Sequence, residues 1–430
     1  MIKRICSLLL LSVALVNAQQ PATSPETIST ALTQKQQLTE TSVVKNVAFE
    51  NIGPTIMSGR VVDLAVNPDN PTEFYVGYAS GGVWHTINNG TTFTPILDSS
   101  NTQNVGDIAV DWKNKTIWVG TGENNSSRSS YAGIGILKST DNGKTWQNMG
   151  LTDSHHIGRI LINPKNPDEV VVGVTGHLYS SNQERGIYKT TDGGQTWSQT
   201  LFVDAMSGII DLQTNPNNYN LMFASSWTKD RKAWNFEGNG NNSAIYKSTD
   251  AGNSWTKVST ENSGFPTGNG VGRIGLAIYN DDVIYAVHDS QFRRPSEENK
   301  ETSNVLTKED FKSMTTETFL ALDDKKLNGY LKMNGFQEKY RANNVKQMVR
   351  SGNVKPIDLA KYIEDANSML FDTPVIGTEV YKSTNGGMTW KKTHNDYLDD
   401  IYYSYGYYFG HIYVAPNNAD NIYIYGVPIV

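Results

Sequence analysis

The sequence predicts an all-β protein, a β-propeller built from four-stranded antiparallel blades. Three observations carry that prediction: one phrase recurs, strand-like runs flank each copy, and a second phrase opens each unit. The first phrase ends at Phe93, Trp146, Trp197, Trp255 and Trp390, at intervals of 53, 51, 58 and 135 residues. An interval of about 50 residues is typical of a repeat architecture, and the last interval contains an insertion.

The recurring phrase is predicted to form the turn of a hairpin. Its copies are STDNGKTW from Ser139, TTDGGQTW from Thr190, STDAGNSW from Ser248 and STNGGMTW from Ser383, with a weaker copy, TINNGTTF, from Thr86. The Asp can accept hydrogen bonds from turn amides, the Gly permits positive φ, and the Trp anchors the next strand. We expect these residues to be structural and not catalytic.

The second phrase supplies the opening strand of each unit. It begins at Gly59, Gly106, Gly158, Gly208, Gly272 and Gly410. A second strand, a loop of variable length, a third strand, the recurring turn and a fourth strand follow, which is the content of one propeller blade. Counting the opening strands predicts five complete blades and the first half of a sixth.

The chain ends at Val430, in the middle of a predicted blade. Because a closed ring needs its last blade finished, we expect this sequence to be a truncated copy of a longer protein. The alternative is that the segment from Phe49 to Pro54 supplies a closing strand to an open or six-bladed ring.

The fifth blade contains a helical insertion, assigned to residues 294–372. Thr307, with Glu309 and Asp310, resembles a helix start, and apolar residues then recur at helical spacing from Phe311 to Leu331. We expect a small helical cap on the propeller rim; a lid over the ligand site is the alternative.

The N-terminus predicts export. Lys3 and Arg4 precede the apolar run from Ile5 to Val16, and small residues end at Ala18. Residues 1–18 are therefore assigned as a signal peptide, 19–48 as a polar linker and 49–430 as the propeller. The destination is the periplasm, the cell surface or the extracellular space. The apolar run is too short to span a bilayer, and no later segment approaches the ~20 apolar residues that a membrane span requires.

Composition excludes several classes of function. The single cysteine, Cys6, lies in the signal, so the mature chain has no disulfide, thiolate metal site or cysteine nucleophile. The formal charge is −6, or −8 without Lys3 and Arg4, and basic residues form no long block, so nucleic acid is not an expected partner. His155 and His156 suggest a metal, but neighbouring strand residues point to opposite sides and no third ligand is evident; we predict no metal and no cofactor.

Function is expected on the face opposite the recurring turns, where the loops between second and third strands lie. Candidate ligand-binding residues come from the ends of first and second strands and from one loop with aromatic residues. They are Arg60, Arg159, His177, Trp227, Arg231, Trp234, Arg273 and His288. The alternative is that Arg60, Arg159 and Arg273 pair with Asp107, Asp211 and Glu123 in an internal network.

Enzymatic activity would require a pair of carboxylates, because glycoside cleavage needs an acid and a base or nucleophile. Asp107 and Glu123 are the best candidates, since they lie on neighbouring antiparallel strands of the second unit. These two residues would be catalytic only if the protein is a glycoside hydrolase.

The recurring turn resembles the Asp-box, or bacterial neuraminidase repeat. Together with GTGEN from Gly120, HHIGRI from His155, GHLY from Gly176 and ERGIYKTTDGG from Glu184, it resembles exported bacterial proteins with a sortilin-like N-terminal domain. Such proteins are often named as glycosyl hydrolases or sialidase-like proteins. The xyloglucanase-type catalytic Asp before a Gly-Gly in blade one is missing, because Ser80 stands before Gly81 and Gly82.

Sortilin-type propellers bind peptides and proteins without catalysing a reaction, and we therefore expect a secreted binding propeller whose ligand is a peptide, a protein or a glycan. A sialidase-like or xyloglucanase-like glycoside hydrolase that uses Asp107 and Glu123 is the competing hypothesis.

Overall fold

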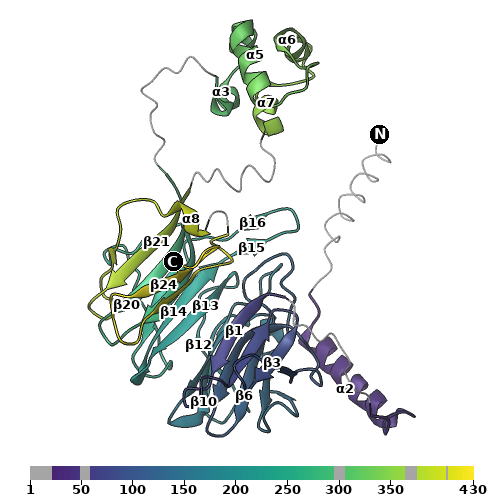
Figure 1. Cartoon of the computed structure of the whole chain (residues 1–430), viewed down its shortest axis with the longest axis vertical. Helices are drawn as coiled ribbons and strands as arrows, with labels where there is room; N and C mark the ends of the chain where they lie inside the picture. Colours follow the sequence, from purple (N-terminus) through teal and green to yellow (C-terminus); the bar gives the residue numbers. More distant parts are fainter. Residues whose placement is uncertain (1–21, 49–58, 295–305, 364–374, 403–404) are drawn as a thin grey trace, which may run out of the picture.

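The computed structural model describes residues 22–48, 59–294, 306–363, 375–402 and 405–430, and this part of the chain is dominated by five four-stranded antiparallel sheets (Figure 1). The first two are β1–β4 (Val61–Val66, Phe74–Tyr78, Gly82–Thr86, Thr94–Pro95) and β5–β8 (Val105–Asp111, Thr116–Thr121, Ile136–Ser139, Gln147–Asn148). The third is β9–β12 (Ile157–Asn163, Asn166–Val174, Gly186–Thr190, Ser198–Leu201). The fourth is β13, β14, β17 and β18 (Ser207–Asn215, Asn218–Thr228, Ala244–Ser248, Thr256–Lys257), and the fifth is β19–β22 (Val271–Ile278, Ile284–Arg293, Val375–Ser383, Lys391–Lys392).

Two smaller sheets complete the described β structure. They are β15–β16 (Asp230–Arg231, Phe236–Glu237) and β23–β24 (His411–Val414, Ile422–Tyr425). Within each large sheet the strands pair in chain order, and the opening strands of consecutive sheets lie next to one another. Core clusters lie between adjacent sheets; one joins Trp118 and Ile136 of the second sheet to Ile157 and Val172 of the third. This arrangement is consistent with the predicted propeller.

The recurring phrase forms the turn between the third and fourth strands of every large sheet, as the sequence predicts. In the third sheet, Thr190 Oγ1 accepts a hydrogen bond from the amide of Gly194 at 3.0 Å, and Asp192 Oδ1 accepts one from the amide of Thr196 at 3.0 Å. The closing Trp197 donates from Nε1 to the carbonyl of Met149 at 2.7 Å, which connects this turn to the preceding sheet. These contacts give the phrase a structural role.

We expect the Thr190→Ala variant to lower the free energy of unfolding by about 1 to 3 kcal/mol, because the buried Gly194 amide loses its acceptor. Urea denaturation would measure the change. Thr191→Ala is the matched control, since Thr191 is exposed, and should stay within about 0.5 kcal/mol of the parent. Equal losses in both variants would contradict the structural role of the turn hydroxyl.

In each of the five large sheets, the opening strand has one extra residue relative to its partner. The register shifts between Val61 and Asp63 in β1, between Val105 and Asp107 in β5, and between Ile209 and Asp211 in β13. Equivalent shifts lie beside Arg159 in β9 and between Val271 and Ile274 in β19. A β-bulge of this kind changes the direction in which the following side chain points. All five large sheets therefore carry the same irregularity at the same place.

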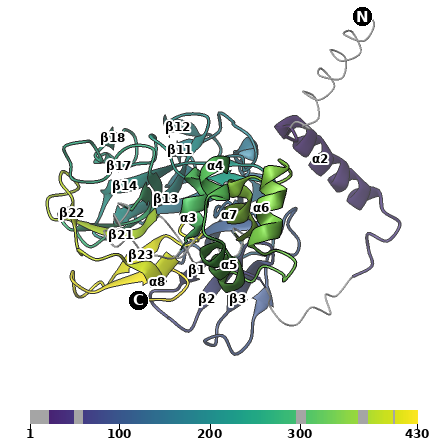
Figure 2. The ribbon, with the colours of Figure 1, turned by 90° about the horizontal axis from the view of Figure 1, so that it is seen from above.

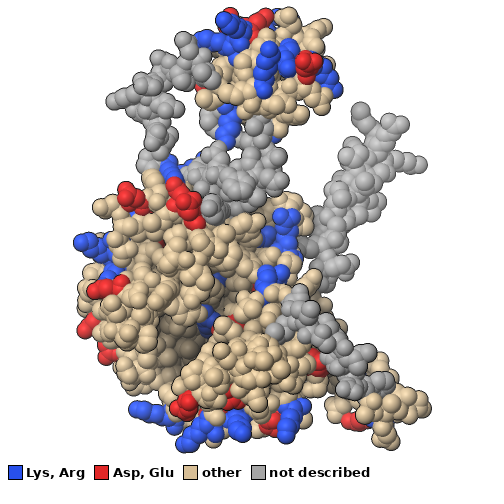
Figure 3. Space-filling model, viewed as in Figure 1, with Lys and Arg blue, Asp and Glu red and all other residues tan. Residues whose placement is uncertain are grey.

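Residues 308–363 form five helices around a core of their own. They are α3 (Lys308–Ser313), α4 (Thr316–Leu320), α5 (Asp324–Met333), α6 (Ala342–Arg350) and α7 (Pro356–Ile363). The predicted start at Thr307 is confirmed, because Thr307 and Asp310 form a capping box. Phe311, Phe319 and Leu327 are fully buried between these helices. Figure 1 shows the helices beyond one end of the strands, Figure 2 shows them from above, in front of the strands, and Figure 3 shows Lys and Arg side chains on them.

The strands on either side of the insertion lie side by side, since Arg293 of β20 pairs with Val375 of β21. We expect a chain in which a short Gly/Ser linker replaces residues 295–374 to keep its sheets and to change in free energy of unfolding by no more than about 1 kcal/mol. Circular dichroism and denaturation would test this. Aggregation or loss of the β spectrum would show that the helices complete the core of the sheets.

The segment before the sheets contains a helix that the sequence analysis did not predict. Helix α2 (Pro25–Thr41) begins at Ser24, whose hydroxyl accepts a hydrogen bond from the amide of Thr27, and none of its residues is buried. The sequence pattern did not reveal it because the helix has no apolar face. A short helix, α8 (Asp399–Tyr402), precedes β23. The predicted signal peptide and the segment from Phe49 to Pro54 lie outside the described residues, and none of the described helices is long and apolar enough to cross a membrane.

Candidate functional site

The bulges bring charged side chains of successive opening strands together, at Asp63, Asp107, Arg159, Asp211 and Arg273. Counting from each opening Gly placed Arg60 and Ile209 at the positions equivalent to Asp107. That assignment is wrong for the first and fourth sheets, because their bulges fall at Val62 and Ile210, after the counted residue. Asp63 and Asp211 occupy the equivalent positions.

Arg159 is the centre of this charged group. Its Nη1 lies 2.8 Å from Asp107 Oδ1 and 4.0 Å from Asp63 Oδ1, and its Nε lies 3.1 Å from Asp211 Oδ1. Asp107 Oδ2 also accepts a hydrogen bond from the amide of Ile160 at 2.7 Å. Burial and the Asp63 carboxylate raise the pKa of Asp107, and the Arg159 guanidinium opposes that shift. Arg159 is therefore held by carboxylates of the protein itself, as the internal-network alternative predicts.

Glu123 is paired in the same way. Arg60 donates to its two oxygens at 3.0 and 2.5 Å, Ser130 Oγ donates at 2.7 Å and Tyr408 Oη at 2.9 Å. Glu123 is buried, and 37% of the Arg60 side chain is exposed. All of these donors converge on one carboxylate, so its acceptor capacity is largely used within the chain.

Arg273 differs from the other two arginines. It is buried and donates to Asn125 Oδ1 at 2.7 Å and to the carbonyl of Tyr408 at 2.9 Å. Among the described residues, no carboxylate lies within ion-pair distance of Arg273, and burial lowers the pKa of its guanidinium to about 10. The predicted pairing of Arg273 with an acid is therefore wrong, and neutral oxygen atoms accept its hydrogen bonds instead.

The predicted aromatic loop is mostly packed. Trp227 is fully buried and donates from Nε1 to the carbonyl of Gly238 at 2.7 Å. The Arg231 guanidinium lies 3.8 Å from the ring centre of Phe236, inside the protein. Trp234, by contrast, is 85% exposed. Trp227 and Arg231 therefore pack around Phe236 inside the protein, and only Trp234 of the three is exposed.

His288, another predicted ligand-binding residue, is also buried. Its Nδ1 lies 3.4 Å from Glu379 Oε2, and its Nε2 accepts a hydrogen bond from the amide of Gly272 at 3.3 Å. It therefore lies inside the fifth sheet and not at a ligand-accessible surface.

A pocket of about 410 Å³ lies on the face that the sequence assigned to function. The loop after β6 and the loop after β10 form its walls, with His177 as the one member of the predicted ligand-binding set. The pocket is lined by Ala22, Arg128, Ser130, Tyr131, Ala132, His155, His156, His177, Leu178, Tyr179 and Ser180. Arg128, Tyr131 and Tyr179 are exposed, so they form its rim.

Two buried cations lie close to this pocket. Lys229 Nζ donates to the carbonyl of His177 at 3.0 Å, and Arg185 donates to the carbonyls of His177 and Ser180, each at 2.8 Å. Neither cation has a carboxylate partner within the described ranges, and burial lowers the pKa of Lys229. Arg185 therefore lies beside the pocket without a carboxylate partner among the described residues, whereas burial disfavours the charged form of Lys229.

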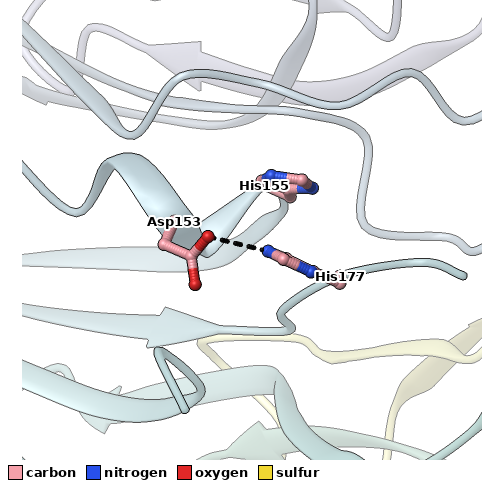
Figure 4. A group of neighbouring side chains, drawn as sticks. All are labelled: Asp153, His155 and His177. Carbon is pink, nitrogen blue, oxygen red and sulfur yellow. Dashed lines mark hydrogen bonds and ion pairs between the residues drawn. The ribbon is translucent and has the colours of Figure 1, made fainter. Parts of the chain in front are cut away.

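Sequence reasoning missed a group of three side chains at the pocket, Asp153, His155 and His177 (Figure 4). Their potential ligand atoms all lie within 4.8 Å of one another. His177 Nε2 lies 3.0 Å from Asp153 Oδ1, and the rings of His155 and His177 stack with centroids 3.7 Å apart. Burial lowers the pKa of His155 to about 4, so its imidazole is neutral at pH 7.

The prediction of no metal rested on His155 and His156 lying in a strand, and that premise is wrong. Residues 152–154 form a 3₁₀ turn, β9 begins only at Ile157, and His155 has φ 54° and ψ −38°. Because β9 and β10 are antiparallel neighbours, the start of β9 and the end of β10 lie at the same end of the third sheet. His155 precedes β9 and His177 follows β10, so antiparallel pairing would have predicted that they lie close together.

The repeated four-stranded meanders, joined through their opening strands, define a β-propeller. Residues 135–348 match the family profile described as "Sortilin, neurotensin receptor 3", which confirms the resemblance to the sortilin-like propellers inferred from the motifs. A search of curated protein sequences returned no match.

Solved structures with a similar fold include an ancestral GH74 enzyme and the GH74 enzyme of Niastella koreensis. The first has 14% identity and a TM-score of 0.52 over 88% of this chain, and the second has 18% identity and a TM-score of 0.50 over 86%. The chain spans 37% and 44% of the length of these two proteins. At such identities the likeness shows the fold alone.

Proposed function

We propose that this protein is an exported β-propeller that binds a peptide, protein or glycan ligand without cleaving it. The propeller would comprise five complete blades and part of a sixth, with its ligand on the face opposite the recurring turns. The observation that carries this proposal is the pocket rimmed by Arg128, Tyr131 and Tyr179, next to the buried Lys229 and Arg185. The exposed tyrosines and the exposed guanidinium of Arg128 at the rim favour a ligand with an acidic group.

The arrangement of carboxylates favours binding over hydrolysis. A general acid or base must exchange a proton with the substrate within hydrogen-bond reach. Asp107 is already bound by Arg159 and an amide, and Glu123 by Arg60, Ser130 and Tyr408. Activity at either residue would first require those bonds to break.

The test is an array of acidic and neutral peptides and glycans, followed by titration of the tightest binder. We expect Arg128→Ala to weaken binding of an acidic ligand by about 1.5 to 3 kcal/mol, because a charged hydrogen bond is lost. Lys144→Ala is the matched control: Lys144 is an exposed cation in a recurring turn, on the other face, and its loss should leave affinity unchanged.

Fluorogenic glycosides assayed in parallel decide between the two classes of function. Turnover by the parent protein that disappears in folded Asp107→Asn or Glu123→Gln variants would overturn the binding proposal in favour of a glycoside hydrolase. Equal loss of affinity in the Arg128 and Lys144 variants would place the ligand elsewhere.

A further inference from the structure

We propose that Asp153, His155 and His177 form a binding site for a divalent transition-metal ion of the Zn²⁺ type. Two imidazoles and one carboxylate are a donor set suited to zinc and its first-row neighbours, whereas Ca²⁺ and Mg²⁺ prefer oxygen ligands alone. The proposal is independent of the ligand-binding function proposed above.

The backbone holds His155 in an uncommon conformation. Its φ of 54° with ψ of −38° is rare for a residue with a side chain, and Leu151, four residues earlier, also has positive φ. The carbonyl of His155 accepts a hydrogen bond from the amide of Gly133 at 2.7 Å, which fixes this conformation. Strained residues of this kind concentrate at functional sites.

The backbone of Asp153 is held by the neighbouring loop. The carbonyl of Asp153 accepts a hydrogen bond from Asn182 Nδ2 at 2.8 Å, and its amide donates to Glu184 Oε2 at 2.7 Å. These bonds tie the 3₁₀ turn before β9 to the loop that carries His177. The three side chains are therefore brought together by the structure of both loops and not by one flexible segment.

The imidazole of His177 already has the partners of a metal-binding histidine. Ser180 Oγ lies 2.8 Å from Nδ1 and would orient the ring, while Nε2 faces Asp153 Oδ1. Polar partners on the second nitrogen are typical of histidines that bind metals. The ring nitrogens of His155, in contrast, have no hydrogen-bond partner among the described residues.

The charges around the three residues are mixed. The Glu184 carboxylate accepts a hydrogen bond from the amide of Asp153, and Arg185 donates to the carbonyls of His177 and Ser180. His155 and His177 also line the pocket of about 410 Å³, so the group is open on that side. Three protein ligands and an open side leave room for water or for an oxygen of a bound ligand, which is the arrangement of exchangeable sites and not of closed structural ones.

Separations of up to 4.8 Å are longer than those between atoms sharing one zinc ion at about 2 Å from each. Metal binding therefore requires the His155 ring to rotate out of its stack on His177. The competing explanation is that Asp153, His177 and Ser180 form only a hydrogen-bonded chain that supports the loop.

The experiment titrates the untagged full chain, freed of metal by chelation, with Zn²⁺ against a chromophoric chelator, and records the visible absorption of the Co²⁺ form. His155→Phe is the test variant, because phenylalanine can keep the stack but offers no ligand. We expect the parent to bind one ion and the variant to bind it at least about tenfold more weakly. His85→Ala, which removes a histidine beside Glu73, is the matched control and should keep the parent affinity.

Asp153→Asn provides a second variant, and melting curves without metal show whether each variant is folded. A Co²⁺ spectrum present in the parent and in His85→Ala, but lost in folded His155→Phe and Asp153→Asn, would support the site. Absence of binding by the parent, or equal binding by parent and both site variants, would overturn it and leave the hydrogen-bonded chain as the explanation.

Discussion

The Arg159→Ala variant is expected to lose about 3 to 5 kcal/mol of unfolding free energy, because breaking a buried ion pair leaves uncompensated charge. Arg159 faces Asp107 at 2.8 Å, Asp211 at 3.1 Å and Asp63 at 4.0 Å, so its removal leaves three carboxylates facing one another. Chemical denaturation at neutral pH measures the loss.

A control variant and a double variant test whether the lost ion pair causes the loss of stability. Arg128→Ala removes an exposed arginine from the pocket rim and should change stability by no more than about 0.5 kcal/mol. Adding Asp107→Asn to Arg159→Ala should restore part of the stability, since one unpaired charge disappears. A loss of less than about 1 kcal/mol in Arg159→Ala would mean that the carboxylates find other partners or protons at little cost.

The second large effect is expected at Asp289, where removal of a charge should stabilise the protein. Asp289 is buried in β20, with a hydrogen bond from Gln291 Nε2 at 2.9 Å, and burial raises its pKa to about 7. A shift of this size corresponds to at most about 4 kcal/mol. We expect Asp289→Asn to gain about 1 to 3 kcal/mol at pH 8, because the amide has no charge to desolvate.

The pH dependence gives the sign of this effect. The folded protein holds a proton on Asp289 between about pH 4 and pH 7 that the unfolded chain has already released. Stability of the parent relative to the variant therefore falls as the pH rises through that window. Melting temperatures of the two proteins should agree near pH 4 and diverge by pH 8. A variant less stable than the parent at pH 8 would show that the ionised carboxylate is favourably paired.

The repeated turns and opening phrases made the fold predictable, since each phrase has one local structure and returns at a regular interval. The bulges were not predictable in the same way. A bulge shifts the following side chains by one position, and no particular residue type marks it in the sequence. Counting from the opening Gly therefore assigned Arg60 and Ile209 to the positions that Asp63 and Asp211 occupy. Helix α2 also escaped prediction because it packs no apolar face.

The members of the candidate site were harder to predict than the face on which to look. The pocket lies on the face opposite the recurring turns, and His177, at the end of a second strand, lines it. Burial could not be inferred from residue type. Trp227, Arg231 and His288 have chemistry suited to a ligand and are buried within the protein, whereas Tyr131 and Tyr179, which were not among the predicted ligand-binding residues, form the rim.

The contacts between neighbouring sheets have a consequence for cooperativity. Asp63 accepts a hydrogen bond from the amide of Ile108 in the next opening strand, and Trp146 donates to the carbonyl of Ile96 in the preceding sheet. The junction between the first and second sheets is thus held at two places, by Asp63 at the opening strands and by Trp146 at the recurring turn. A sheet that opens alone would expose polar groups of its neighbour as well as its own. Amide hydrogen exchange across such a junction should therefore report a shared opening event, and the first sheets should unfold as one unit rather than one by one.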